Sequence, residues 1–305
     1  MGQLKPYLMK FAEKFRNILT EIRRHKQDNH DTRLLIGSLL AKDSKAVQSI
    51  KDAEFKVFSQ FGDDGIIQFL INRLSLVDHS FVEFGVESYE ESNTRFLLLN
   101  NNWRGLVIDG SEQHIDYIRK DPIYWRHNLT AVSSFITTEN INHLLSSNGF
   151  ADKIGLLSID IDGNDYWVWQ AITETEADVV VIEYNSLFGK DRAITVPYKA
   201  DFVRTAAHYS NLYFGASLLA LCDLGKAKGY TFVGCNQAGL NAYFVKDHLV
   251  GDLISLTPEE GYVQAQFREA RNRSGDLTFA GYTERREEIK GLPVVNTRTN
   301  LIEYL

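Results

Sequence analysis

Five short apolar segments, each followed by a stretch with helical spacing, constrain the fold more than any other feature of the chain. They are FVEFGV (81–86), GLVIDGS (105–111), NLTAV (128–132), IGLLSIDIDG (154–163) and DVVVIEYN (178–185). Strands that alternate with helices predict a parallel, doubly wound α/β sheet with helices on both faces. Segments as continuously apolar as DVVVIEY agree, because strands of such a sheet are buried on both sides.

Two further apolar segments, YTFVGCNQ and LNAYFVKDH, predict a final hairpin with Gly239 near its turn. A longer insertion and a helix at 215–228 precede them. The hairpin places one antiparallel strand at the edge of a mostly parallel sheet. This pattern is similar to the Rossmann-like fold of class I methyltransferases, whereas a plain dinucleotide-binding fold would continue with parallel units.

The chain is expected to divide into a helical N-terminal arm (1–50), a main α/β domain (51–250) and a C-terminal appendage (251–305). A first helix is predicted over 7–26, a second over 31–41, and a third after Asp63 or Asp64. Apolar residues at helical spacing define the first helix: Leu8, Phe11, Phe15, Ile18, Leu19 and Ile22. Basic residues occupy its other positions, so it is interpreted either as a helix packed on the domain or on a second copy, giving a homodimer, or as a membrane-surface helix.

The net charge of −7 disfavours nucleic acid as a general partner, because phosphate binding depends on lysine and arginine. Cys222 and Cys235 are too far apart for a CxxC motif, so a reducing cytoplasm is the expected location. No apolar run approaches the length of a membrane span, and the first residues lack the continuous apolar core of a signal peptide.

The first strand ends at Gly85 and runs into an acidic loop. The GxGxxG fingerprint of dinucleotide sites is missing, because Glu87 and Glu90 stand where glycines would be. Such a loop repels a pyrophosphate and attracts a sulfonium or an ammonium group. The charge therefore favours S-adenosylmethionine over NAD, with Gly85 allowing close approach of the ligand.

Two acids of the neighbouring strands are further candidates. Asp109 ends the second strand, where a carboxylate can accept hydrogen bonds from ribose hydroxyls; the alternative is a helix cap. Glu83 lies inside the first strand, where a buried carboxylate needs a partner. It is interpreted as a ligand for the amino group of the cofactor, or as half of an ion pair with a core arginine or lysine.

A second acidic group follows the fourth and fifth strands. Asp160 and Asp162 are two residues apart and point to one face if the strand is still extended there, and Glu183 with Asn185 has the same spacing. Neighbouring strands bring the four side chains together, and a divalent cation such as Mg²⁺ would neutralise them. Three alternatives stay open: a general base beside a protonated carboxyl, caps of the helix near Asn164, and contacts to the sulfonium side of the cofactor.

Methyl transfer to oxygen also requires a group that takes the hydroxyl proton. The candidates are Asp160, Asp162, Glu183 and His208, or a metal that lowers the hydroxyl pKa. His208 lies in the insertion after the fifth strand, which is expected to cover the acceptor. Tyr213 and Ser217 are candidates to line the same pocket.

Three further segments belong with the strand and hairpin segments described above: SQFGDDGII (59–67), NNWRGLVIDGS (101–111) and ENIN (139–142). On these segments together, the chain resembles the FkbM-like S-adenosylmethionine-dependent methyltransferases. The resemblance covers most of residues 55–250. It implies a methyl donor held by Gly85, Glu87 and Asp109, with Gln60 over its methionine end. Ala131 and Val132 are implied to lie beside the adenine.

The resemblance also implies the acceptor, a hydroxyl of a sugar, a glycan or a natural product, as in polysaccharide biosynthesis. A phosphate-type oxygen is a further possibility. Two other classes of function compete with this interpretation. One is a metal-dependent hydroxylase or hydrolase-like enzyme that uses Asp160, Asp162 and Glu183 directly, and the other is a non-catalytic scaffold.

Overall fold

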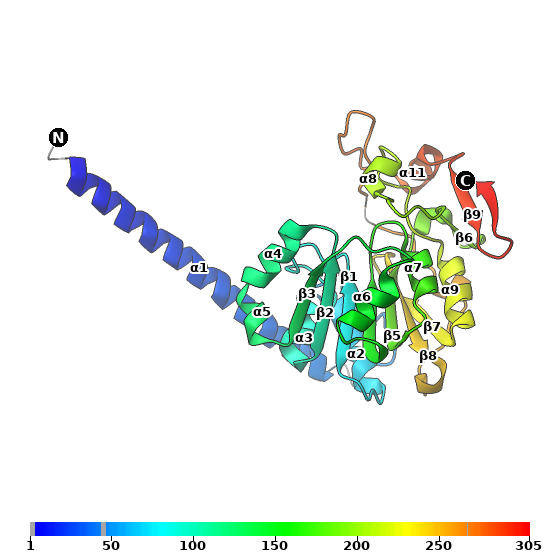
Figure 1. Ribbon diagram of the computed structural model, residues 1–305, viewed down its shortest axis with the longest axis horizontal. Coiled ribbons are helices and arrows are strands. Elements are labelled where there is room, and N and C mark those ends of the chain that lie inside the picture. The colour runs from blue at the N-terminus through cyan, green and yellow to red at the C-terminus, as the bar shows by residue number, and fades with distance from the viewer. Residues whose placement is uncertain (1–3, 44–46, 267) are drawn as a thin grey trace.

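The computed structural model describes residues 4–43, 47–266 and 268–305, without the side chains of residues 4–12 and 23. Its centre is a seven-stranded sheet with the order β3-β2-β1-β4-β5-β8-β7 (Figure 1). The strands are β1 (Ser80–Phe84), β2 (Arg104–Asp109), β3 (Leu129–Ser133), β4 (Asp152–Ile159), β5 (Thr175–Glu183), β7 (Tyr230–Cys235) and β8 (Asn241–Lys246).

The first five strands run parallel, and β8 pairs antiparallel with both β5 and β7. The predicted sheet and its final hairpin are therefore confirmed, with Gly239 in the turn at φ +75°. The strand order reverses between β1 and β4, because one half of the sheet grows from β1 through β2 and the other from β4 through β5. In doubly wound sheets the ligand lies beyond the carboxyl ends of the strands at such a switch point.

Successive residues of the central strands enter two different cores, one on each face of the sheet. Phe81 packs in one core and Val82 in the other, and Val181 and Ile182 alternate in the same way. This is the two-sided burial that the apolar strand segments predict. The main-domain helices outside the insertion are α2 (Asp63–Arg73), α3 (Arg95–Asn101), α4 (Glu112–Lys120), α5 (Pro122–Arg126), α6 (Ile141–Ser147), α7 (Asp165–Ala171) and α9 (Leu218–Ala227).

The N-terminal arm is one helix, α1 (Leu4–Asp43), where the sequence predicts two separate helices. The segment between them, QDNH, contains neither proline nor glycine, so nothing in it interrupts the backbone hydrogen bonds. The last turns pack on the body, with Leu34 and Ala41 against Val57 and Phe96. The rest projects away from the domain (Figure 1). In the described part of the chain, no helix combines the length and the apolar character needed to cross a bilayer.

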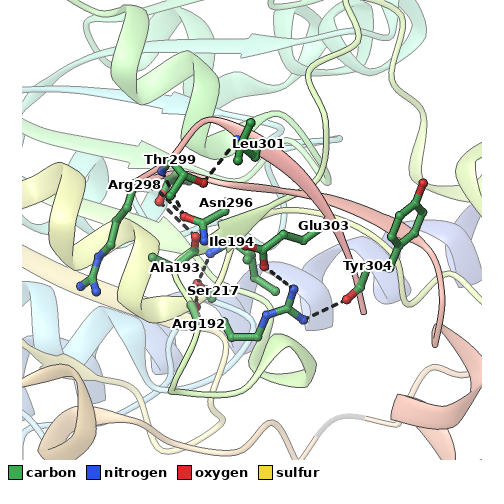
Figure 2. Close-up of polar contacts among 11 residues, drawn as sticks. Arg192, Ala193, Ile194, Ser217, Asn296, Arg298, Thr299, Leu301, Glu303 and Tyr304 are labelled. Carbon is green, nitrogen blue, oxygen red and sulfur yellow. Dashed lines mark hydrogen bonds and ion pairs between the residues drawn. The ribbon is translucent and has the colours of Figure 1, made fainter.

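A second sheet joins the insertion after β5 to the C-terminal segment. Its order is β10-β9-β6, with β6 (Ile194–Thr195), β9 (Pro293–Asn296) and β10 (Leu301–Tyr304). Figure 2 shows the contacts that close it, among them an ion pair of 2.7 Å between Arg192 and Glu303. The remaining helices are η2 (Ser186–Phe188), α8 (Arg204–Ala207), η3 (Asp247–Leu249), α10 (Pro258–Gly261) and α11 (Tyr282–Glu288). Part of the predicted main domain thus pairs with the predicted appendage.

Candidate functional site

A cleft of about 440 Å³ lies at the carboxyl ends of β1, β2, β4 and β5. This volume is within the range of small-molecule pockets, roughly 300–1,000 Å³. The predicted residues Gln60, Glu83, Gly85, Glu87 and Asp109 line it. Asp160, Asp162 and Glu183 line it as well.

Gly85 allows the chain to leave β1 close to the loop after β4. Its φ is +70°, and a Cβ built on it would lie 1.7 Å from the carbonyl oxygen of Asp160. The sequence attributes this glycine to the approach of a ligand. The structure adds a packing reason, because no side chain fits between the two backbone segments.

Asp109 fixes the loop that follows β1. Its Oδ2 accepts a hydrogen bond from the backbone N–H of Glu87 at 2.8 Å. Its Oδ1 accepts one from the N–H of Ser111 at 2.8 Å and contacts Nδ1 of His114 at 3.1 Å. Ser111, not Asp109, caps α4 with its side chain. An ionised carboxylate offers about four acceptor positions, so Asp109 retains capacity for a ribose hydroxyl.

Glu83 holds the loop that follows it. Its carboxylate accepts hydrogen bonds from the hydroxyls of Ser92 and Thr94 and from the backbone N–H groups of Asn93 and Thr94. Burial raises the pKa of Glu83, and these hydrogen bonds oppose the rise. The core ion pair considered for Glu83 is not among its hydrogen-bonded or ion-pair contacts in the described residues. Asn93, which the loop positions, lines the cleft.

Asp160, Asp162 and Glu183 come together as predicted, but by a different geometry. β4 ends at Ile159, and Asp162 has φ +56°, so the two aspartates follow the strand in a turn and are not two residues of an extended segment. Ile159 pairs with Ile182, which makes the residues that follow them neighbours. One carboxylate oxygen from each of the three acids lies within 4.8 Å of the others.

Glu183 is the most enclosed member of this acidic cluster. It is 8% exposed, and its Oε2 has no hydrogen-bond partner in the described structure. Burial raises the pKa of Asp160 and of Glu183 well above the ordinary carboxyl range. The charges of the neighbouring acids add to the rise, and the Arg204 guanidinium opposes it.

Arg204 is the functional candidate that sequence reasoning missed. It lies in α8 of the insertion and contacts Asp162 through Nη1 at 2.5 Å, and its guanidinium stacks on Phe214 at 3.9 Å from the ring centroid. Arg204 lines the cleft beside the three acids. The sequence carries no local signal for this contact, because 42 residues separate the two partners.

Asp165 supports the turn that carries the two aspartates. It is completely buried and accepts hydrogen bonds from the N–H groups of Ile161 at 2.8 Å and Gly163 at 2.9 Å. Burial raises its pKa to about 6. The interpretation of Asp162 as the helix cap is wrong, because the N-cap of α7 is Asn164 and the turn is fixed by Asp165. Asp162 is thereby left to interact with Arg204.

Four other predicted residues lie away from the cleft. Asn185 donates to the carbonyls of Leu212 and Phe214 and accepts from the N–H of Leu187, so its amide is used inside the insertion. His208 contacts the hydroxyl of Ser210, and Tyr213 donates a hydrogen bond to the carbonyl of Pro293. Ser217 caps α9 and donates a hydrogen bond to the carbonyl of Arg192 (Figure 2). The structure does not bring these side chains to the acids.

Ala131 and Val132, implied to lie beside the adenine, pack in the two cores on either side of β3. The cleft is lined instead by Ser134, Phe135 and Ile136, which follow the strand. Phe135 is an exposed aromatic ring at 47%. The signal in the sequence for this cleft position is an aromatic residue shortly after the end of β3.

Comparison with known proteins gives similarity only at the level of solved structures. No protein-family model matches the chain, and no curated protein matches it. The chain is similar to an O-methyltransferase from Bacillus cereus in complex with SAH, with 13% identity and a TM-score of 0.37 over 55% of this chain and 74% of that one. It is similar to an S-adenosylmethionine-dependent methyltransferase from Clostridium acetobutylicum, with 11% identity and a TM-score of 0.39 over 60% and 90% of the two chains.

The N-terminal domain of EvdMO1 with SAH bound is also similar, with 8% identity and a TM-score of 0.39 over 68% and 93% of the two chains. At these identities and TM-scores the comparisons assign neither an activity nor a ligand. The fold class rests on the strand order and pairing of the chain itself.

Proposed function

We propose that the chain is an S-adenosylmethionine-dependent methyltransferase that acts on an oxygen of its acceptor. One observation carries the proposal: the cleft at the switch point has carboxylates at two places. Glu87 and Asp109 lie at the ends of β1 and β2, and Asp160 and Glu183 lie at the ends of β4 and β5. A cleft with this charge favours a ligand that carries positive groups, and S-adenosylmethionine carries a sulfonium and an ammonium.

The lining residues fit the parts of this cofactor. Asp109 has acceptor capacity for ribose hydroxyls, and Phe135 and Ile136 offer an aromatic and an apolar surface to adenine. Gln60 and Asn93 are the polar groups available to the methionine end. When bound, the cofactor supplies a methyl group already activated by its positive sulfur.

The chain must then align an acceptor oxygen and remove its proton. Alignment in the cleft converts a bimolecular step into an effectively unimolecular one. Asp160 and Glu183 are the groups that support proton removal, since burial raises their pKa toward the range in which a carboxylate takes a proton effectively. The Arg204 guanidinium, which contacts Asp162, opposes the rise in the pKa of Asp160 and Glu183.

A divalent cation also fits this cluster. Oxygen ligands on opposite sides of Mg²⁺ or Ca²⁺ are roughly 4–5 Å apart, since each bond is about 2.0–2.6 Å long. The three carboxylate oxygens lie within 4.8 Å of one another, which suits the longer bonds of Ca²⁺ as they stand and requires a closer approach for Mg²⁺. Glu183 Oε2 is buried without a partner in the described structure. Asp160, Asp162 and Glu183 would hold the ion, which would lower the pKa of an acceptor hydroxyl. Asn185, predicted as a fourth ligand, is occupied elsewhere.

The proposed acceptor is a hydroxyl of a sugar, a glycan or a natural product, with a phosphate-type oxygen as the variant that a metal would suit. This class comes from the resemblance to FkbM-like methyltransferases, which no family model supports. A cytoplasmic location is proposed on the two free cysteines, Cys222 and Cys235.

Titration calorimetry tests the proposal directly. The chain is expected to bind S-adenosylmethionine and S-adenosylhomocysteine and to ignore NAD⁺. Repeating the titration with Mg²⁺ and with EDTA tests the metal, and Asp109→Asn should weaken binding of both cofactor forms. Incubation with the donor and a panel of sugars should add one methyl mass to a product. An empty cleft at saturating donor, or preferential binding of NAD⁺, would overturn the proposal.

A further inference from the structure

Eight apolar side chains of α1 lie on a face that no other part of the described chain covers. They are between 38% and 62% exposed: Phe15, Ile18, Leu19, Ile22, Leu35, Ile36, Leu39 and Leu40. The residues of α1 that contact the body, including His30, Leu34, Gly37 and Ala41, belong to a different face. Most of α1 projects from the domain (Figure 1). The eight side chains are therefore left without a covering partner in the described chain.

The spacing of this face follows a heptad rather than the simple period of a surface helix. Counting Leu8 as position a, the a and d positions are Leu8, Phe11, Phe15, Ile18, Ile22, His25, Asn29, Thr32, Ile36 and Leu39. Seven of these ten residues are apolar. A repeat of 3.5 residues keeps a narrow seam in line only if two helices supercoil around each other.

We propose that two copies of this chain pair through α1 as a parallel, two-stranded coiled coil. The body contacts α1 mainly from its b, c and f positions, opposite the seam, and Lys26 and Arg33 add contacts from e positions beside it. The exposed side chains at the a and d positions leave a second helix free to approach the seam. Polar Asn29 at a central a position is a feature that fixes register and the two-stranded state. The proposal depends on α1 alone and is independent of the proposed methyl transfer.

Charge complementarity gives the orientation. In a parallel pair, each g residue faces the e residue of the next heptad of the partner. Glu21 then faces the partner's Lys26, and Asp28 faces the partner's Arg33. An antiparallel pair sets e against e and g against g, which would bring lysine and arginine together on one side and the two acids together on the other. Lys26 forms an ion pair with Glu90, but its side chain is 77% exposed, so it can turn toward a partner helix.

The same helix carries basic residues next to the seam, so an anionic membrane surface is the competing occupant of the apolar face. The coiled coil and the membrane-surface helix predict different oligomeric states for the purified protein without lipid. A coiled coil forms in solution without lipid, whereas a membrane-surface helix leaves the chain monomeric until vesicles are added.

Analytical ultracentrifugation of the full chain over a range of micromolar concentrations tests the pairing. A dimer is expected. Ile18→Glu with Ile22→Glu should weaken dimerisation by roughly 30-fold or more, as for two central interface residues. The matched control, Asn17→Glu with Thr20→Glu, adds the same charges to the c and f positions and should leave the dimer intact. A wild-type monomer that floats with phosphatidylglycerol vesicles, or a dimer that survives the Ile18 and Ile22 changes, would overturn the proposal.

The orientation has a separate measurement. Ile22→Cys places two cysteines at facing a positions of a parallel pair, so mild oxidation should link the chains covalently. The unmodified chain, whose Cys235 is buried and Cys222 partly buried, is the control for background linking. A dimer of the Ile22→Cys variant that forms no disulfide between the introduced thiols would refute the parallel arrangement.

Discussion

At the scale of single residues, Gly85 has two separate requirements, a left-handed backbone and the absence of a side chain. Gly189 has a similar φ of +76° but nothing within 4 Å of its missing Cβ. Gly189, at φ +76° and ψ −172°, lies in a region that essentially only glycine adopts, and such a conformation costs any other residue about 1–3 kcal/mol. We predict that Gly189→Ala lowers the free energy of unfolding by about this amount, as measured by urea denaturation.

Gly85→Ala should lower the free energy of unfolding well beyond Gly189→Ala, because its Cβ also meets the Asp160 carbonyl at 1.7 Å. The backbone of Asp160 must move, so affinity for S-adenosylhomocysteine should fall as well. Equal effects of the two substitutions on stability would show that the close contact is relieved without consequence.

Glu183 gives a prediction about pH. Its pKa in the folded chain is raised well above 4.5 by burial and by Asp160 and Asp162. The folded state therefore holds the proton longer than the unfolded state, and the associated stability is lost as pH rises through the folded pKa. Gln is neutral at every pH. Glu183→Gln should therefore raise the free energy of unfolding relative to wild type, and in urea unfolding the difference should grow as the pH rises above about 5.

The same substitution should reduce methyl transfer, because it removes a proposed proton acceptor. Glu174→Gln, at an exposed glutamate, is the control and should change stability by less than about 0.5 kcal/mol at every pH. A pH-independent effect of Glu183→Gln would contradict the assignment of its buried charge.

At the scale of elements, the turn between β4 and α7 depends on one buried carboxylate. Asp165 satisfies two backbone N–H groups of the turn that carries Asp160 and Asp162. We predict that Asp165→Ala lowers the free energy of unfolding by about 2 kcal/mol, since it leaves both donors unsatisfied. Donor affinity should fall with it, because the turn borders the cleft.

Ser217→Ala provides the contrast at another element boundary. It removes the cap of α9 and the hydrogen bonds of the hydroxyl with Ile194 N–H and the Arg192 carbonyl, and should cost about 1–3 kcal/mol in urea denaturation. Ser217 lies away from the cleft, so affinity for S-adenosylmethionine should not change. Loss of donor affinity in Ser217→Ala, or unchanged affinity in Asp165→Ala, would contradict the placement of the corresponding element.

At the scale of the whole molecule, the cleft draws on strands from both halves of the sheet and on the insertion. A ligand that binds there stabilises only the folded state, by about 2.7 kcal/mol at 100 times its dissociation constant. We predict that S-adenosylhomocysteine at this excess raises the melting temperature by about 5 °C in differential scanning fluorimetry. NAD⁺ at the same concentration is the control, and an equal shift with NAD⁺ would contradict the charge argument.

The insertion and the C-terminal segment form one unit with its own core, which includes Phe188, Ile194 and Ile289. This unit places Arg204 against the acids. Sequence reasoning divides the same residues between a main domain and an appendage, because β6 is only two residues long and gives no periodic signal. The domain boundaries remain predictions.

The sequence by itself determined the sheet, its antiparallel end and the meeting of Asp160 with Glu183. Each follows from local properties: apolar segments report two-sided burial, and neighbouring parallel strands place their carboxyl ends at one edge. Only the tertiary structure decided that Arg204 reaches Asp162, that Asp165 rather than Asp162 fixes the turn, and that Phe135 replaces Ala131 at the cleft. These depend on side chains distant in sequence, or on where a strand stops, and such contacts leave no periodic trace in the chain.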